Sequence, residues 1–209
     1  MANFAQIIEQ IIKSEGGYQN MPTDTGNYSC GELAGTKYGI SAIGLEAYLG
    51  RCILASDVLA LTKDDAKTIY RNNYWDKIRG DEIESYSVAY IIMDHYIMNP
   101  TTATKLVENV LKKFGINTNV NNQFSQAVIS DINKCEAKDF FLAYKEERRL
   151  AFEKLRSSKP EFMDGWLNRL NKFTFDDWKM PLRNYLLFAG VGAIIIIVFF
   201  QLLPFKPKR

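Results

Sequence analysis

The chain is organised around residues 7–41, which read IIEQIIKSEGGYQNMPTDTGNYSCGELAGTKYGIS. Apolar residues recur at the spacing of one helical face, at Phe4, Ile7, Ile8, Ile11 and Ile12. Glu15 follows Ile11 and Ile12 by four and three residues, so its carboxyl group lies on the same face. Gly16 and Gly17 then end the helix. The pattern predicts a helix whose last turn carries one carboxyl group. This group would lie at the edge of any cavity that the following loop encloses.

The place of Glu15 on an apolar face is consistent with two roles. A carboxylate that is buried without a partner is costly, and such a group becomes protonated near neutral pH instead. A protonated carboxyl group is what a general acid needs. A Glu that merely ends an apolar stripe in solvent is the commoner case. The spacing alone leaves both roles open.

The loop after this helix supplies a second carboxyl group. From Asn20 to Gly35 no helical period continues, and we expect a small hairpin or irregular β-lobe. Asp24 lies in this loop, nine residues after Glu15, and Thr36 begins the return segment. Glycosidic cleavage uses one carboxyl group to protonate the leaving oxygen and another to activate water or stabilise positive charge. An Asp in such a loop is also a common turn residue, so both roles of Asp24 stay open.

The rest of the chain has mainly helical patterns. Thr62 with Asp65 predicts one helix start and Thr102 another, while Pro100 and Gly115 mark helix ends. We expect helices at about 42–49, 62–75, 88–99, 102–114, 123–133, 136–155 and 161–173. The predicted fold class is mainly α, with a small irregular β-lobe near the N-terminus.

The charge distribution argues against a nucleic-acid ligand. The 209 residues have a net charge of +2, but residues 181–209 contain four basic residues and no acidic one. The remainder therefore has 22 basic and 24 acidic side chains. A near-neutral, slightly acidic domain lacks the basic surface that binds phosphate backbones.

The cysteines and the single histidine do not have the spacing of a metal site, and we expect no metal and no organic cofactor. Free thiols are the default expectation for Cys30, Cys52 and Cys135. A Cys30–Cys52 bridge is the alternative if the domain works outside the cytoplasm. His95 lies on an apolar helical face, where a core histidine is commoner than a catalytic base.

Residues 185–203 form a long apolar run in which only Gln201 is strongly polar. Nineteen such residues suffice for a bilayer core of about 30 Å, so we expect one C-terminal transmembrane helix. A buried helix of a soluble protein is the alternative. Basic residues in the tail 204–209 outnumber those before the run, which favours a cytoplasmic C-terminus and a domain on the periplasmic or wall side.

Four segments together resemble glycoside hydrolase family 108. They are Glu15–Tyr18, Thr36–Ser41, Leu61–Asp81 and Gly165–Leu170, in the family's order within residues 4–174. Members are N-acetylmuramidases of bacteria and phages with an associated peptidoglycan-binding region. The resemblance implies an α+β lysozyme-like fold, no cofactor, and peptidoglycan glycan strands as the partner.

The resemblance also implies roles for individual residues. Glu15 matches the catalytic acid, and Asp24 and Thr36 match residues that place water or steady the developing charge. Tyr18 and Tyr38 could shape a sugar cleft, although such aromatic residues are more often core residues, and Asp94 could be structural or could line the cleft. The same holds for two tryptophans, Trp75 and Trp166, which are more often core residues than sugar platforms.

The combined prediction is a membrane-anchored muramidase that cleaves the β-1,4 bond between N-acetylmuramic acid and N-acetylglucosamine. The predicted regions are a catalytic region at 1–100, a helical, peptidoglycan-binding-like region at 101–174, a tether at 175–184, the anchor at 185–203 and a basic tail. A phage or prophage endolysin is one setting for such a protein. A lytic transglycosylase and a non-catalytic tethering protein are the alternatives, and the oligomeric state is left open.

Overall fold

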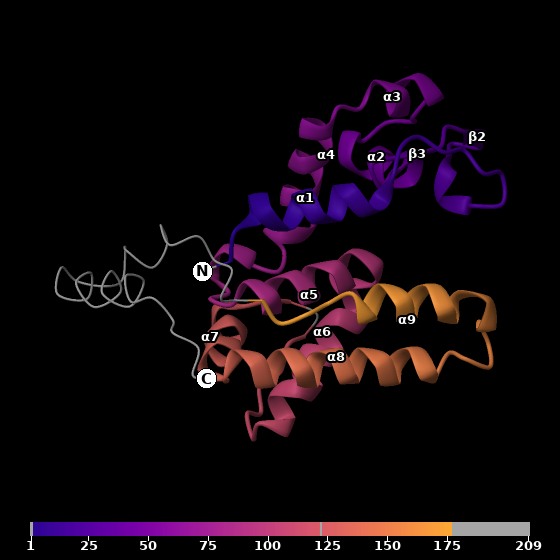
Figure 1. Ribbon diagram of the computed structural model, residues 1–209. Coiled ribbons are helices and arrows are strands. Elements are labelled where there is room, and N and C mark those ends of the chain that lie inside the picture. Colours follow the sequence, from indigo (N-terminus) through magenta and orange to yellow (C-terminus); the bar gives the residue numbers. More distant parts are fainter. Residues whose placement is uncertain (1, 122, 177–209) are drawn as a thin grey trace, which may run out of the picture. The chain divides into compact units, whose positions relative to one another are not determined.

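The computed structural model describes residues 2–121 and 123–176 of the protein (Figure 1). Met1–Phe175 forms one compact unit. The described chain is mainly helical with two very small sheets, which agrees with a lysozyme-like α+β fold. The predicted division at residue 100 stays a prediction, because helices on both sides of it contribute to one continuous apolar core.

Helix α1 spans Phe4–Glu15, as its apolar periodicity predicts. The Asn3 side chain begins the helix by accepting a hydrogen bond from the backbone N–H of Ala5. The predicted stripe is buried, at Ile7, Ile8, Ile11 and Ile12. Gly16 caps the end of the helix, with a φ of 75° that is easily adopted only without a side chain. Glu15 is therefore the last residue of α1.

The β-lobe consists of two short antiparallel pairs. Strand β1 (Tyr28–Ser29) pairs with β2 (Glu32–Leu33), and β3 (Thr36–Lys37) pairs with β4 (Ile40–Ser41). Tyr38 and Gly39 join β3 to β4, and both have positive φ, which is typical of a tight two-residue hairpin. Gln19 pairs with Thr36 through two backbone hydrogen bonds of 2.9 and 2.8 Å. The segment after Glu15 is thereby fixed to the hairpin.

Three helices follow the β-lobe. They are α2 (Ala42–Leu49), the unpredicted α3 (Ala55–Ala60) and α4 (Lys63–Tyr70). The predicted Thr62 and Asp65 pair caps α4 reciprocally, each side chain bonding the other residue's backbone N–H. A π-helical turn, Arg71–Trp75, then leads through a short 3₁₀ turn, Gly80–Glu82, towards the next helix.

The remaining helices are α5 (Tyr86–Met98), α6 (Pro100–Lys113), α7 (Gln126–Lys134), α8 (Ala137–Glu153) and α9 (Met163–Asn171), with a 3₁₀ turn at Pro160–Phe162. Helix α5 packs on α6 and α8, and α9 packs on α8 (Figure 1). The expected start of α6 at Thr102 is wrong. Asn99 is the cap and Pro100 the first helical residue, because the Asn99 side chain accepts a hydrogen bond from the Thr102 N–H and Pro fits a first turn.

The free-thiol expectation is wrong for two of the three cysteines. Cys30 and Cys52 form a disulfide, with Cα atoms 5.7 Å apart, in the usual range for such a bridge. The turn between β1 and β2 is thereby joined to the segment after α2. Cys135, on the other hand, is a free thiol.

The predicted anchor, residues 185–203, lies outside the described residues, as do most of the predicted tether and the basic tail. Within residues 2–121 and 123–176, no helix has both the length and the apolar character needed to cross a membrane.

Candidate active site

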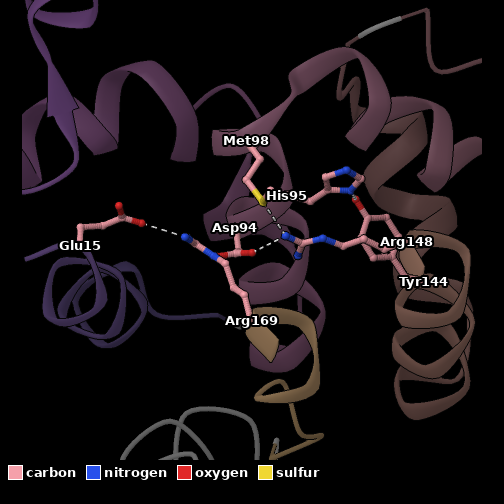
Figure 2. Close-up of polar contacts among 7 residues, drawn as sticks. All are labelled: Glu15, Asp94, His95, Met98, Tyr144, Arg148 and Arg169. Atoms are coloured by element: carbon pink, nitrogen blue, oxygen red, sulfur yellow. Dashed lines mark hydrogen bonds and ion pairs between the residues drawn. The ribbon is translucent and has the colours of Figure 1, made fainter. Parts of the chain in front are cut away.

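Glu15 does not lie unpartnered on the apolar face, in contrast to one of the two expectations. Its Oε1 accepts a hydrogen bond of 3.0 Å from Nη2 of Arg169, a residue of α9 (Figure 2). The Glu15 side chain keeps 22% of its surface exposed. The carboxylate therefore combines a fixed cation with access from solvent.

Arg169 is itself held from the opposite side. Its Nε and Nη2 donate hydrogen bonds of 2.9 and 2.7 Å to Oδ1 of Asp94, on α5. Burial lowers the pKa of Arg169, but attraction to Asp94 and Glu15 outweighs burial and leaves that pKa raised. Arg169 thus stays charged and has a fixed orientation.

The second oxygen of Asp94 accepts a hydrogen bond of 2.7 Å from Nη2 of Arg148. The residues Glu15, Arg169, Asp94 and Arg148 therefore alternate in sign, and we call them the charge row (Figure 2). The Asp94 and Arg148 side chains are 4% and 0% exposed. The row runs from a buried ion pair to a carboxylate that solvent can reach.

The buried end of the charge row lies among apolar and aromatic groups. Nη2 of Arg148 contacts the Met98 sulfur at 2.9 Å, and its guanidinium lies 5.5 Å from the Phe152 ring centroid and 5.8 Å from that of Phe173. Its Nε and Nη1 have no hydrogen-bond partner among the described residues. Asp94 is consequently the main counterion of a fully buried cation, and its removal would be strongly destabilising.

The hairpin between β3 and β4 packs directly on Glu15. The Tyr70 hydroxyl donates a hydrogen bond of 3.2 Å to the Tyr38 carbonyl. A Cβ added at Gly39 would overlap the Tyr70 hydroxyl and would lie 2.9 Å from Cγ of Glu15. Burial, followed by the nearby Glu15 charge, raises the pKa of Tyr70, which keeps this hydroxyl protonated. A glycine is therefore required where the hairpin approaches the carboxylate.

Asp24 and Thr36 belong to one polar network in the β-lobe. Asp24 is exposed, and its Oδ1 accepts a hydrogen bond of 2.9 Å from the Gly26 N–H, the turn role that its loop sequence suggests. The Thr36 hydroxyl donates to Oδ1 of Asn27 at 2.6 Å. The Gln19 side chain donates to Asn27 at 3.1 Å and to Asp24 at 3.5 Å. Their catalytic roles stay predictions, and Asn27 and Gln19 are the residues that connect them.

The predicted sugar-contacting residues lie in three different environments. The Tyr18 hydroxyl donates to the Ala34 carbonyl at 3.2 Å, and the Tyr18 ring packs against the core. Tyr38 is partly exposed at the hairpin turn. It borders a groove of about 470 Å³ that is lined by Glu9, Gln10, Ile12, Lys13, Gly16, Gly17, Tyr38 and Lys63. Asp94 lies in the charge row, with both oxygens on arginines, so contact with a sugar stays a prediction.

Of the three residues expected in the core, His95 and Trp75 are buried, and Trp166 is partly buried against the core. His95 is buried, and its Nδ1 shares a hydrogen bond of 2.9 Å with the Tyr144 hydroxyl. Burial, and then the nearby Arg148 charge, lowers the pKa of His95 to about 3. The indole N–H of the buried Trp75 donates a hydrogen bond to Asp81. The Trp166 ring stacks on the rings of Phe152 and Phe162.

Sequence reasoning missed both arginines of the charge row. Arg169 lies within the Gly165–Leu170 segment that carries the family resemblance, so a signal was present. Arg148 follows Glu146 and Glu147 and precedes Arg149, and nothing in that charged run indicates that one member is buried. Among residues 2–121 and 123–176, no group of three or more His, Cys, Asp and Glu side chains is placed to hold a metal ion.

Residues 8–99 match the family model described as glycosyl hydrolase 108. No match was found among curated proteins. Among solved structures, the fold is similar to that described as "Structure of Brucella abortus SagA", with a TM-score of 0.67 and 29% sequence identity. That similarity covers 81% of this chain and 90% of the Brucella abortus chain. Glu15 and the β-lobe lie inside the region that matches the glycosyl hydrolase 108 model.

Proposed function

We propose that the protein is a peptidoglycan hydrolase that cleaves the β-1,4 bond between N-acetylmuramic acid and N-acetylglucosamine. One observation carries the proposal. Glu15 presents a solvent-accessible carboxyl group at the end of α1, against the β3–β4 hairpin, inside the region that matches glycosyl hydrolase 108. That family implies glycoside hydrolase activity, and a carboxyl group in such a place is suited to protonating a glycosidic oxygen.

In the proposed reaction, Glu15 gives its proton to the glycosidic oxygen while the bond from that oxygen to C1 of the muramic acid breaks. Water adds to C1, and its proton passes to Asp24, with Thr36 helping to place the water. Asp24 suits the role of base because it is exposed and hydrogen-bonded to the Gly26 N–H and Gln19 rather than paired with a cation. Attack from the face opposite Glu15 would invert the anomeric centre.

The proposed substrate is a glycan strand that lies against the hairpin. Tyr38 is partly exposed beside Gly16 and Gly17, on the groove that borders the end of α1. A tyrosine ring suits contact with the apolar face of a sugar, and its hydroxyl suits hydrogen bonding. Tyr18 would support this surface from the core side through its bond to the Ala34 carbonyl.

We also propose that residues 185–203 hold the hydrolase at a membrane, with the domain on the periplasmic or wall side. The support is the sequence alone: nineteen nearly uninterrupted apolar residues followed by a basic tail. Protease added to intact spheroplasts should then digest residues 1–175. Protection of these residues would overturn the orientation, and release of the full chain by high salt would overturn the anchor.

The activity is tested on purified peptidoglycan with the full chain, by following new reducing ends. Glu15→Gln keeps the shape of the side chain but removes its proton-donating ability. Activity should fall by at least about a hundredfold, since general acid catalysis typically contributes a factor of this size. Glu146→Gln is the matched control, because Glu146 is a carboxylate that pairs with Arg149 on α8, outside the groove and the charge row. That control should keep its activity.

The alternatives are separate outcomes of the same experiment. Products that end in a 1,6-anhydro sugar, without new reducing ends, would replace hydrolysis by a lytic transglycosylase reaction. Binding to peptidoglycan without any bond cleavage would replace both reactions by a tethering role. Equal activity of the wild type and Glu15→Gln would remove Glu15 from the mechanism.

A further inference from the structure

We infer that Asn27 is a positioning residue for the attacking water: it takes the only hydroxyl hydrogen of Thr36, so that Thr36 can offer the water nothing but an acceptor. The inference rests on the proposed function, in which Thr36 helps to place the water and Asp24 receives its proton. Asn27 is fully buried, so it acts through Thr36 and does not touch the reacting atoms.

The backbone of Met21 fixes the orientation of two side-chain amides. Its N–H can only donate, and it donates a hydrogen bond of 2.9 Å to Oε1 of Gln19. Its carbonyl can only accept, and it accepts a hydrogen bond of 3.0 Å from Nδ2 of Asn27. Exchanging the oxygen and nitrogen of either amide would bring two donors or two acceptors together. Oδ1 of Asn27 is therefore the atom that meets the Thr36 hydroxyl, at 2.6 Å.

The two amides also bond each other. Nδ2 of Asn27 donates its second hydrogen to Oε1 of Gln19 at 3.0 Å, and Nε2 of Gln19 donates to Oδ1 of Asn27 at 3.1 Å. Nε2 of Gln19 also donates to Oδ2 of Asp24, at a longer 3.5 Å. Both amide hydrogens of Asn27 are thus in use, and Asn27 has none to give to Thr36. The Thr36 hydroxyl must be the donor in their hydrogen bond.

The main chain holds Thr36 in place beside Asn27. The Asn27 carbonyl accepts hydrogen bonds of 2.8 and 2.9 Å from the N–H groups of Ala34 and Gly35, the two residues before Thr36. Thr36 and Gln19 also exchange two backbone hydrogen bonds. The position of the Thr36 hydroxyl and the direction of its hydrogen are therefore both fixed by Asn27 and Gln19.

This arrangement determines how a water is oriented at Thr36. A hydroxyl whose hydrogen is already used offers only lone pairs, and the Asp24 carboxylate likewise only accepts. A water between Thr36 and Asp24 directs one hydrogen to each of them, which leaves a lone pair of the water oxygen free for C1 of the muramic acid.

The proposed step is balanced with the water in this orientation. The bond from the water oxygen to C1 forms while the bond from C1 to the leaving oxygen breaks, and the leaving oxygen takes the proton of Glu15. One water proton passes to Asp24. The other stays on the new hydroxyl group of the sugar, with Thr36 as its acceptor, and Thr36 keeps its own hydrogen on Asn27.

The test is a double-mutant cycle on full chains, with Asn27→Ala, Thr36→Val and the two combined. We would measure kcat and KM on soluble peptidoglycan fragments and correct both for the folded fraction, determined by circular dichroism. Thr36→Ser keeps the hydroxyl and is the conservative variant. Asn133→Ala is the matched control, because the Asn133 amide also bonds two backbone groups, the Glu84 N–H and the Glu82 carbonyl, but lies on α7.

Asn27→Ala and Thr36→Val should each lower kcat by about tenfold to a hundredfold and change KM little, since a displacement of about 1 Å in a reacting group can cost a hundredfold. The double variant should lose no more than the weaker single variant, because Asn27 acts through the hydroxyl that Thr36→Val removes. Thr36→Ser should keep most of the activity, and Asn133→Ala should keep its kcat. Losses that multiply in the double variant, or a wild-type kcat in Asn27→Ala, would overturn the inference.

Proton NMR of the wild type provides a second measurement, which stands even where Asn27→Ala does not fold. A hydroxyl hydrogen that is held by Asn27 should exchange slowly with water and give a resonance of its own. A Thr36 hydroxyl that exchanges as fast as that of the exposed Thr101 would overturn the inference.

The cleavage assay separates this inference from the proposed function. A wild type that cleaves nothing would remove the hydrolase proposal, and with it the water that Asn27 helps to orient. An active wild type that depends on Glu15, but in which the losses of Asn27→Ala and Thr36→Val multiply, would remove only the inference.

Discussion

Protonation of the buried His95 should make this fold sensitive to mild acid. The pKa of His95 is lowered to about 3 by burial and by the nearby Arg148, against an ordinary value of 6.5. The unfolded chain therefore binds a proton at a pH where the folded protein does not. Stability is unaffected by His95 above about pH 6.5 and is lost progressively as the pH falls towards 3.

The size of the effect follows from the two pKa values. Each pH unit below the ordinary pKa of a histidine that stays neutral in the fold lowers the free energy of unfolding by about 1.4 kcal/mol. Between about pH 7 and about pH 5, His95 should therefore contribute a loss of about 2 kcal/mol. His95 is 2% exposed, so solvent screening reduces this figure little.

The assay is urea unfolding at both pH values, with the wild type and His95→Gln. The Gln amide has both a donor and an acceptor, so it can keep a hydrogen bond with the Tyr144 hydroxyl, which lies 2.9 Å from Nδ1 of His95, but it does not titrate. The variant should lose about 2 kcal/mol less stability than the wild type over this range, whatever its stability at pH 7. Equal losses in the two proteins would refute the assignment of His95 as a neutral core residue.

Two further predictions concern the β-lobe. Cys30→Ser should lower the free energy of unfolding by about 3 kcal/mol, the value expected for a disulfide between residues 22 apart in sequence. Cys135→Ser, which removes a free thiol, should change this free energy little. Urea denaturation of the variants, and of the wild type with and without reductant, measures both effects. Gly39→Ala should destabilise by more than Gly115→Ala and should also reduce glycan cleavage. Both glycines have positive φ, but only at Gly39 would the new Cβ overlap the Tyr70 hydroxyl. Equal losses at the two glycines would contradict the close packing of the hairpin.

Local sequence signals predicted most of the helical framework. The stripe from Ile7 to Ile12, the reciprocal cap of Thr62 and Asp65, and the glycine after Glu15 each specify a boundary through interactions within a few residues. Asn99 and Thr102 are both good capping residues, so the sequence alone does not fix where α6 begins. Asn99 is the cap because Pro100, which follows it, fits the first helical position.

The candidate site was predictable only in part, because its decisive contacts join distant segments. Glu15 and Arg169 are 154 residues apart, and Asp94 and Arg148 are 54 apart. An apolar stripe that ends in a glutamate indicates where the carboxyl group lies, but it does not indicate which cation packs against it. The sequence leaves the Cys30–Cys52 disulfide undecided for the same reason, because the spacing of two cysteines along the chain does not show that their thiols meet in the fold.

Hydrolysis of the muramic acid linkage by Glu15 can be followed in water labelled with heavy oxygen. Peptidoglycan is digested with the full chain, the new ends are reduced at once with borohydride, and the muropeptides are analysed by mass spectrometry. We expect heavy oxygen at C1 of new N-acetylmuramic acid ends with the wild type and none above background with Glu15→Gln. Unlabelled 1,6-anhydro ends, label on N-acetylglucosamine, or equal labelling by Glu15→Gln would show that Glu15 does not catalyse this hydrolysis.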